Sequence, residues 1–397
     1  MIPELRRDFN AHYTPAKYRE FLRLLDERSG THVKFRSCET PCFFPRDLID
    51  QMARSGRELL EQLVGNAEYL AAANRAIPPE FRAPRDSAHP LFVQADFGVV
   101  RQPDGSLQPK LVEIQGFPSL YLYQPVLAQV YIDAYGLDSH LSSLLDGLNG
   151  SSYVDLVREA IVGGQNPENV VLLEIDPGEQ KTLPDFLLSE RICGIRTVDI
   201  REVRKQGNRL YYDLDGRRVP IHRIYNRAIA DELIRKRIQP EFDFRDDLDV
   251  EWAGHPNWFF RISKFSIPWL YALRHPSVPK TWFLDQVKDI PGDLENYVLK
   301  PLYSFAGLGV TIGPTSADIE NVPHSLRSEY ILQERMHFEP VIATPFGLTK
   351  AEVRIMYIWL DKLRPVTTII RMGRGKMMGV DQNRDLEWVG ASAGFVV

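Results

Sequence analysis

The chain has 397 residues, of which 44% are hydrophobic and 25% charged, so it can bury a large core and form more than one domain. Its 48 basic and 53 acidic residues give a net charge of −5, which offers no general electrostatic reason to bind nucleic acid or anionic lipid. No segment approaches the roughly 18 apolar residues of a membrane span, so we expect a cytoplasmic protein that binds neither nucleic acid nor membrane.

The first ninety residues are predicted to be mostly helical. An amphipathic stretch at 46–73 places Leu48, Met52, Leu59 and Leu63 near one helix face, and prolines follow it. Apolar runs at 91–100 and 109–115 flank a Pro-Asp-Gly-Ser turn, which predicts a β-hairpin.

The middle of the chain has a different pattern. After helical patterns at 121–135 and 153–161, short β-branched runs at 170–175, 195–200 and 221–225 alternate with a helical stretch at 180–193. This alternation predicts a small parallel α/β unit, with an added hairpin at 209–220. A helix is expected at 264–273 and mainly strands from 297 onward. The predicted domains are 1–90, 91–165, 166–256 and 257–397.

Three cysteines are too few for a set of paired disulfides. Cys38 and Cys42 have no second cysteine pair that would complete a zinc site, and Cys193 stands alone. We therefore expect reduced thiols.

The late segment Tyr-Val-Leu-Lys-Pro at 297–301 is a candidate nucleotide site. Its strand ends on Lys300, a loop with Gly307 and Gly309 follows, and a second strand ends on Gln333 and Glu334. The lysine suits phosphate oxygens, the glycines let backbone N–H groups approach phosphates, and Glu334 suits adenine and ribose. The alternative is a β-hairpin loop beside a core lysine.

A candidate metal site lies on the predicted hairpin. Glu113 and Gln115 are two apart on a strand and face the same side, where Asp96 of the paired strand can reach them. Two carboxylates and an amide oxygen suit Mg²⁺. The alternative is an exposed edge strand with solvated acids.

Several further cations are candidates for binding anionic groups. Arginine forks bind carboxylate or phosphate oxygens in pairs, which would suit Arg227, Arg354 and Arg371, and Lys264 would meet the other side of a triphosphate. The alternatives are a surface role for Lys264 and a structural ion pair of Arg354 with Glu352 or an aspartate.

Together these motifs resemble the ATP-grasp carboxylate–amine ligases. The Glu-Ile-Gln strand at Glu113 precedes the Lys300 strand, which is similar to the permuted branch that includes eukaryotic glutathione synthetase and glutathionylspermidine synthetase. The resemblance implies an α/β (α+β) ATP-grasp fold in which two α+β lobes clasp the nucleotide. A small parallel α/β substrate-side domain and a helical N-terminal region would complete it.

The resemblance also implies roles for individual residues. Metal binding falls to Asp96, Glu113 and Gln115, and catalysis and substrate orientation to Arg227, Arg354 and Arg371. The remaining residues would bind the nucleotide, and they are Lys264, Lys300, Ser304, Gly307, Gly309, Gln333, Glu334 and Lys376. Two departures stand out, because the family usually has asparagine at the position of Gln115 and a glutamate with successive glycines in the loop.

The expected activity is an ATP- and Mg²⁺-dependent ligase that joins a carboxylate to an amine through an acylphosphate. The expected partners are therefore small-molecule carboxylate and amine substrates. The alternatives are a non-catalytic nucleotide-binding or scaffold protein with this fold, and a kinase-like phosphotransferase. The identity of the acid and the amine, and a homodimeric state, stay open.

Overall fold

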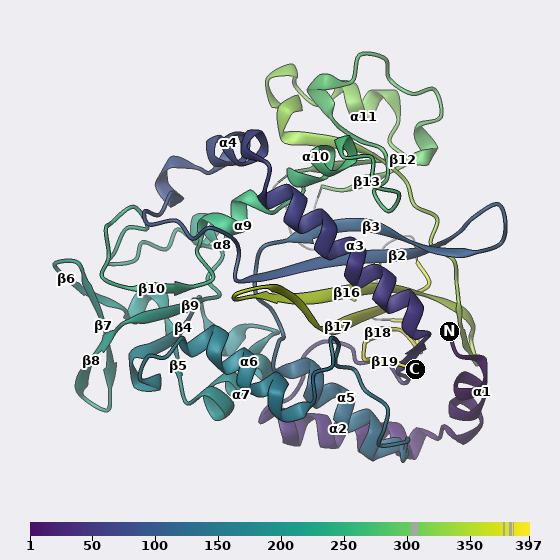
Figure 1. Cartoon of the computed structure of the whole chain (residues 1–397), viewed down its shortest axis with the longest axis horizontal. Coiled ribbons are helices and arrows are strands. Elements are labelled where there is room, and N and C mark those ends of the chain that lie inside the picture. Colours follow the sequence, from purple (N-terminus) through teal and green to yellow (C-terminus); the bar gives the residue numbers. More distant parts are fainter. Residues whose placement is uncertain (303–308, 376–377, 381–382, 384) are drawn as a thin grey trace.

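The structure is a computed structural model that describes residues 1–302, 309–375, 378–380, 383 and 385–397. At its centre lies an antiparallel sheet in the order β18-β17-β16-β2-β3, with β15 paired to β16 (Figure 1). The strands are β2 (Phe92–Arg101), β3 (Leu107–Gln115), β15 (Ile342–Thr344), β16 (Gly347–Trp359), β17 (Leu363–Gly373) and β18 (Gly390–Ser392). The predicted hairpin at 91–115 is confirmed as β2 and β3.

The central sheet has one apolar face and one mixed face, which is apolar at Phe92 and Ile358 and polar further along the strands. Val93, Ala95 and Phe97 alternate along β2 and pack in the same core as Leu59 and Leu60 of α3 (Arg46–Val64). The side chains between them belong to the opposite face, because successive residues of a strand point to opposite sides. That opposite face carries the candidate site.

The N-terminal region is mainly helical, as predicted. It contains α1 (Pro3–His12), α2 (Pro15–Ser29), α3 and α4 (Ala67–Ala76), and the short β1 (Cys42–Phe44) pairs with β19 (Gly394–Val396). The expectation of one helix over 46–73 is wrong: α3 ends at Val64, and the Asn66 side chain caps a new helix by accepting a hydrogen bond from the Tyr69 N–H.

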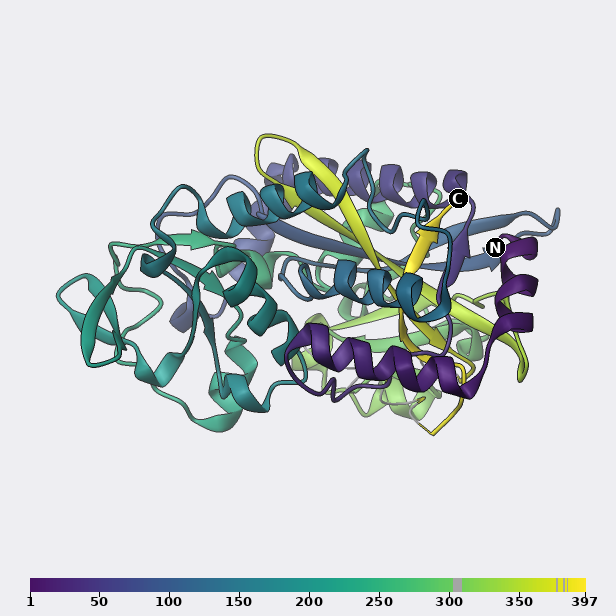
Figure 2. The same cartoon turned by 90° about the horizontal axis from the view of Figure 1, so that it is seen from below.

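Helices also cover the side of the sheet away from α3. α5 (Tyr123–Tyr135) packs against α2 and contacts β17, and α6 (Gly150–Val162) and α7 (Leu183–Cys193) lie beside them (Figure 2). Across the described ranges, no helix combines the length and the apolar character needed to cross a membrane.

A second sheet confirms the predicted parallel unit and adds one strand, at Glu251–Ala253, that was not predicted. β4 (Val170–Glu174), β5 (Arg196–Asp199), β9 (Arg223–Asn226) and β10 (Glu251–Ala253) are parallel, in the order β10-β9-β4-β5. The predicted hairpin at 209–220 is β7 (Arg209–Leu214) with β8 (Arg217–Ile221), extended by β6 (Arg204–Gln206), and α8 (Ala230–Lys236) follows β9. This unit forms the left part of Figure 1.

A third sheet forms a separate lobe above the mixed face (Figure 1). Its strands β11 (Thr281–Phe283), β14 (Tyr330–Glu334), β12 (Tyr297–Pro301) and β13 (Thr311–Ile312) are antiparallel in the order β11-β14-β12-β13. The strands predicted around Lys300 and Glu334 are therefore direct neighbours. The lobe also contains α10 (Ser266–Ala272) and α11 (Ser316–Glu320), and α9 (Asn257–Arg261) precedes it.

Short 3-10 helices connect these elements at Pro79–Phe81, Pro167–Asn169, Pro177–Glu179, Ile200–Glu202, Leu284–Gln286, Leu294–Asn296 and His324–Glu329. The division of the chain at residues 90, 165 and 256 stays a prediction.

Candidate functional site

A cavity of about 680 Å³ lies where the mixed face of the central sheet, the parallel unit and the third sheet meet. The predicted residues that line it are Glu113, Gln115, Arg227, Lys264, Lys300, Gln333, Glu334, Arg354 and Arg371. Asp96 and Gly309 are not among its lining residues, and Ser304, Gly307 and Lys376 lie outside the described residues. Residues from distant parts of the sequence thus converge on one cavity.

The strand register explains why the floor of this cavity is polar. Asp96 of β2 is the cross-strand neighbour of Glu113 on one side and of Arg354 on the other. Arg371 of β17 is the neighbour of Glu352 on β16. Cross-strand neighbours share a face of the sheet, so these side chains gather there.

Asp96 is the centre of an ion-pair network. Its side chain is 1% exposed, and the Arg354 Nε and Nη2 atoms donate to its two carboxylate oxygens at 2.5 and 2.6 Å. The Arg371 Nη2 atom adds a bond of 2.6 Å. Burial opposes the charge of Asp96, but the two arginines outweigh it and lower the pKa of this carboxyl.

This geometry realises the alternative in which Arg354 forms a structural ion pair with an aspartate. It also rules out solvated acids on an exposed strand as the description of Asp96, which is buried. Both carboxylate oxygens of Asp96 are occupied by arginines, so we do not retain Asp96 as a metal ligand.

Two other carboxylates, those of Glu113 and Glu352, line the cavity and repel each other electrostatically. Glu352 is 6% exposed, and its buried Oε1 atom forms an ion pair with Arg371 Nη2 at 3.1 Å but no hydrogen bond in the described part of the chain. Burial raises the pKa of Glu352, and the charges of Asp96 and Glu113 raise it further, against the effect of Arg371. Gln115 Nε2 donates to Glu113 Oε1 at 2.5 Å, which confirms that these two side chains share a face.

The residues around Glu352 could supply only a few of the ligands that a hard cation needs. Within the described ranges, no group of three or more His, Cys, Asp and Glu side chains has the geometry of a metal site. Mg²⁺ is commonly held by one or two protein carboxylates together with phosphate oxygens and water. Glu113 and Glu352, with the Gln115 amide, supply that smaller set.

The lysine of the third sheet is buried against the cavity. Lys300 is 9% exposed, and its Nζ atom donates to Gln333 Oε1 on the neighbouring strand at 2.5 Å. Burial lowers its pKa, as does the charge of Lys264, while Glu113 and Glu352 act in the opposite direction. Lys264 lies in the turn before α10, where a helix start was predicted.

The opposite end of the cavity is built by the parallel unit. Arg227 follows β9 and is 4% exposed; its guanidinium lies over the ring of Phe117, 4.8 Å from the centroid. Its Nη2 atom donates to Thr182 Oγ1 at 3.4 Å, whereas Nε and Nη1 have no hydrogen-bond partner among the described atoms. A buried guanidinium with free N–H groups suits a bound anion.

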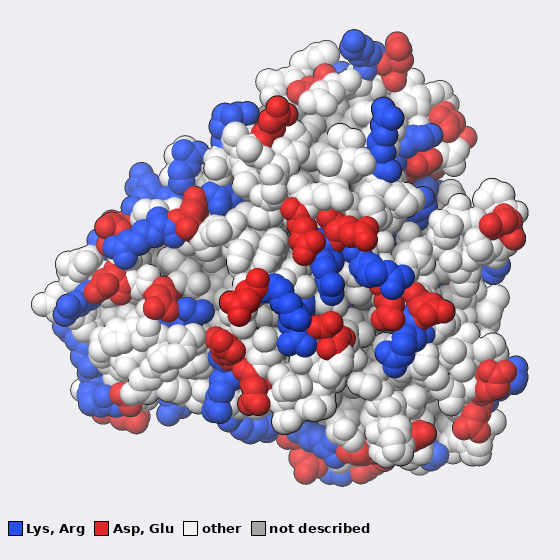
Figure 3. Space-filling view, in the orientation of Figure 1, with Lys and Arg blue, Asp and Glu red and all other residues white. Residues whose placement is uncertain are grey.

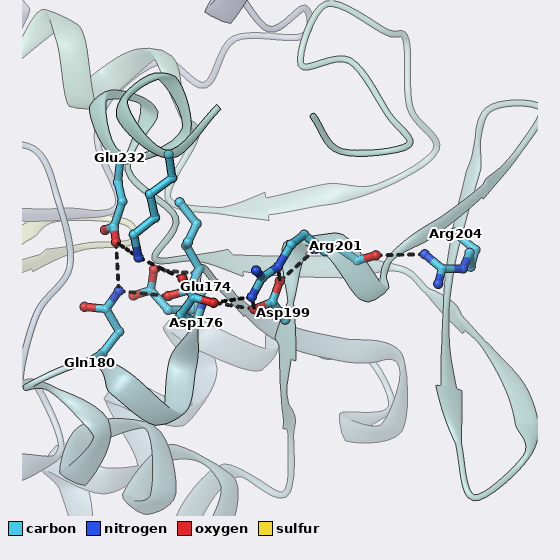
Figure 4. A network of polar contacts seen from close by, with 9 residues as sticks. Glu174, Asp176, Gln180, Asp199, Arg201, Arg204 and Glu232 are labelled. Carbon is cyan, nitrogen blue, oxygen red and sulfur yellow. Dashed lines mark hydrogen bonds and ion pairs between the residues drawn. The ribbon is translucent and has the colours of Figure 1, made fainter. Parts of the chain in front are cut away.

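Glu174 ends β4 beside Arg227 and also lines the cavity. It is 3% exposed, and burial raises the pKa of its carboxyl to about 8 against the opposing charge of Arg227. Figure 4 shows Glu174 among the polar groups at this edge of the sheet, where Gln180 Nε2 donates to Glu232 Oε1 at 3.5 Å. Arg201 pairs with Asp199 at 2.5 Å further along the edge.

Two acidic residues that line the cavity, Glu352 and Glu174, were not predicted from the sequence to bind a ligand. Glu352 lies two residues before Arg354 in a strand, so the period of two could have placed both on one face. Glu174 ends a buried strand of a parallel unit, and ligands commonly bind beyond such strand ends. The aromatic lining by Phe117 and Phe259 had no signal that we recognised.

The charge on the visible surface is mixed. In Figure 3, basic and acidic side chains are interspersed over the face that is seen. The cations at the cavity are therefore a local cluster, in accord with the net charge of the chain.

Comparisons with known proteins support the fold alone. The chain matches no protein-family model, and no curated protein matches its sequence. A glutathione synthetase-like effector from Globodera pallida, solved in its apo form, is similar in structure with a TM-score of 0.61 and 13% sequence identity. The match covers 98% of this chain and 99% of the other. This chain therefore has a glutathione synthetase-like α+β fold.

Proposed function

We propose that the protein is an ATP-dependent ligase of the ATP-grasp type that joins a carboxylate to an amine. The observation that carries this proposal is one cavity lined by Lys300 of the third sheet and Lys264 before α10, together with arginines from the other two sheets. Such a cavity, in a glutathione synthetase-like fold, suits a triphosphate at one end and an acid at the other.

The nucleotide would lie against the third sheet. Lys300 and Lys264 would meet its phosphates, and Gln333 and Glu334 its adenine and ribose. The fit is supported by Lys300, which forms no ion pair with a carboxylate in the described chain, and by the Gln333 Nε2 atom, which is buried without a hydrogen-bond partner there. Phosphate and base would supply these missing partners.

The metal would lie at the cavity floor. Glu113, Gln115 and Glu352 would hold Mg²⁺, whose charge would relieve the repulsion between the two carboxylates and neutralise the nucleotide phosphates. The assignment is supported by the buried Oε1 atom of Glu352, which forms an ion pair with Arg371 but accepts no hydrogen bond within the described residues.

The acid would bind at the parallel unit. Arg227 would hold a carboxylate through the two N–H groups that lack a partner among the described residues, and the buried Glu174 would accept or donate a hydrogen bond beside it. A carboxylate is a poor electrophile, so the reaction needs an activated acid. A carboxylate oxygen would attack the γ-phosphorus of ATP and release ADP, and the amine would then displace phosphate from the acylphosphate.

Arg354 and Arg371 would stabilise charge at the transferring group while Asp96 keeps them in place. The same contacts favour a second candidate, a nucleotide-binding protein without turnover. Both arginines already have a buried counter-charge in Asp96, which weakens their attraction for a further anion.

The experiment combines binding with turnover. The protein is incubated with ATP, Mg²⁺ and a panel of amino acids, dipeptides and polyamines, and ADP release and amide formation are measured by mass spectrometry. We expect acceptor-dependent ADP with an amide product. Nucleotide binding without ADP for any pair supports the second candidate, and a stable phosphorylated product would indicate a kinase.

Two variants separate the parts of the site. Lys300→Ala should weaken ATP binding at least tenfold in calorimetry, whereas Glu113→Gln should remove Mg²⁺-dependent turnover and leave a measurable affinity for ATP. The control is Lys362→Ala, which removes an exposed lysine between β16 and β17. If Lys300→Ala binds ATP like this control, the nucleotide assignment is refuted.

A further inference from the structure

Three sulfur atoms meet in the core away from the cavity. The Sγ atoms of Cys38 and Cys42 lie 3.5 and 3.6 Å from the Sδ atom of Met372. All three side chains are fully buried. The backbone N–H groups of the two cysteines donate to Ala391 and Ala393 at 2.7 and 2.9 Å, so the C-terminal strands hold both cysteines in place.

A buried arginine lies next to this sulfur cluster. Arg6 of α1 is 3% exposed, and its Nη1 atom donates to the Pro41 carbonyl at 3.0 Å. Its Nε and Nη2 atoms have no hydrogen-bond partner, and it forms no ion pair with a carboxylate of the described chain. The ionisable groups in its electrostatic surroundings are Cys42, Cys38 and Tyr131.

The charge of Arg6 is therefore unbalanced while both thiols are protonated. The rings of Phe9 and Phe43, at 4.8 and 5.7 Å from the guanidinium, attract a cation but carry no net charge. An unpaired charge in a protein core is costly, and it favours an anionic group nearby.

Among metal ions, the charge balance selects a monovalent one. Two thiolates with a monovalent cation carry a net charge of −1, which opposes the positive charges of Arg6 and of the Met1 ammonium near Cys42, whereas two thiolates with a divalent cation are neutral and balance neither. Zinc also takes four ligands, and the described residues place no group of three His, Cys, Asp or Glu side chains together. Thiolate and thioether donors select Cu(I).

We propose that Cys38, Cys42 and Met372 bind one soft monovalent cation of the Cu(I) class, through two thiolates and a thioether, with Arg6 balancing the charge. Metal–sulfur bonds of about 2.3 Å would place three sulfurs in a plane about 4 Å apart, within about half an ångström of the separations between each cysteine and Met372. Binding displaces two thiol protons to solvent and involves no change of oxidation state. The site is independent of the proposed ligase.

The test uses the reduced full chain without oxygen. It is incubated overnight with Cu(I) and then challenged with bathocuproine disulfonate, and retained copper is measured. We expect one retained equivalent, and X-ray absorption should show only sulfur in the first shell of the metal. Cys42→Ala and Met372→Leu should weaken retention at least tenfold, while Cys193→Ala, which removes a buried cysteine of α7, should retain copper like wild type.

Arg6→Met tests the charge balance, because it keeps all three sulfurs. We expect at least tenfold weaker retention of Cu(I) at unchanged sulfur coordination. Complete loss of copper from wild type to the chelator, nitrogen or oxygen in the first shell, or equal losses in the Cys193 and Cys42 variants would each overturn the proposal. If Cys42→Ala does not fold, the X-ray absorption measurement of the first metal shell in wild type tests the proposal instead.

Discussion

The buried carboxyl of Glu174 makes the stability of this protein depend on pH. Glu174 is 3% exposed, and burial raises the pKa of its carboxyl from 4.5 to about 8. Between these values the carboxyl is ionised in the unfolded chain but protonated in the folded one. The unfolded state then binds fewer protons, so the free energy of unfolding falls as the pH rises.

The size of this effect follows from the shift. One pKa unit corresponds to about 1.4 kcal/mol, so Glu174 should cost about 4 kcal/mol of stability between pH 5 and pH 8. Below pH 4.5 the carboxyl is protonated in both states, and above pH 8 it is ionised in both, so its contribution is constant there. Glu174→Gln removes this titration and retains an oxygen that can accept from the Ile175 N–H.

The assay is urea-induced unfolding at pH 5, 6, 7 and 8 for wild type and Glu174→Gln. As the pH rises, the free energy of unfolding of the variant should increase relative to that of wild type by about 1.4 kcal/mol per pH unit. Glu179→Gln is the matched control, because it removes a nearby carboxylate whose side chain is 86% exposed, and its difference from wild type should not vary with pH. A constant difference for Glu174→Gln as well would refute the reasoning.

Three further predictions concern packing and buried charge. Gly98→Ala should destabilise the protein by about 1–3 kcal/mol in urea unfolding, because the added Cβ would lie 2.0 Å from the Phe338 ring; Gly150→Ala, which has open space, should cost far less. Asp185→Ala should cost about 3 kcal/mol, since the carboxylate accepts from three backbone N–H groups, and Asp185→Asn should cost less. Asp96→Asn should cost about 3–5 kcal/mol by removing the buried counter-charge of Arg354 and one of the two carboxylates that pair with Arg371, and an unchanged thermal midpoint would contradict that pairing.

Local pattern accounts for the elements that were predicted correctly. The alternation of residues along β2 and β3 and the turn between them are encoded within about 25 consecutive residues, and each predicted strand of the parallel unit is likewise a short local pattern, although β10 was not predicted. The break between α3 and α4 was missed because its signal is one Gly-Asn step inside a continuous apolar periodicity. The Asn66 cap starts a new helix at this point and so ends the continuous helical pattern.

The site was predictable as a set of residues but not as a set of contacts. Lys300, Glu113 and Arg227 have residue types and strand-end positions that indicate binding, and they do line one cavity. Whether Asp96 faces a metal or an arginine depends on Arg354, which is 258 positions away in the sequence. The pairing is set by the register of β2 against β16.

Most of the strands and the residue types available for binding could be predicted from the amino-acid sequence, because strand alternation, turns and strand ends are local properties of the chain. Which charges neutralise each other depends on the tertiary structure. It buries Asp96 between two arginines and brings Cys38 and Cys42 into contact with Met372. Among the described residues, it also leaves N–H groups of Arg227 and Arg6 without a hydrogen-bond partner. Electrostatic partners are chosen by distance and burial in space, and strand register and sheet packing fix both.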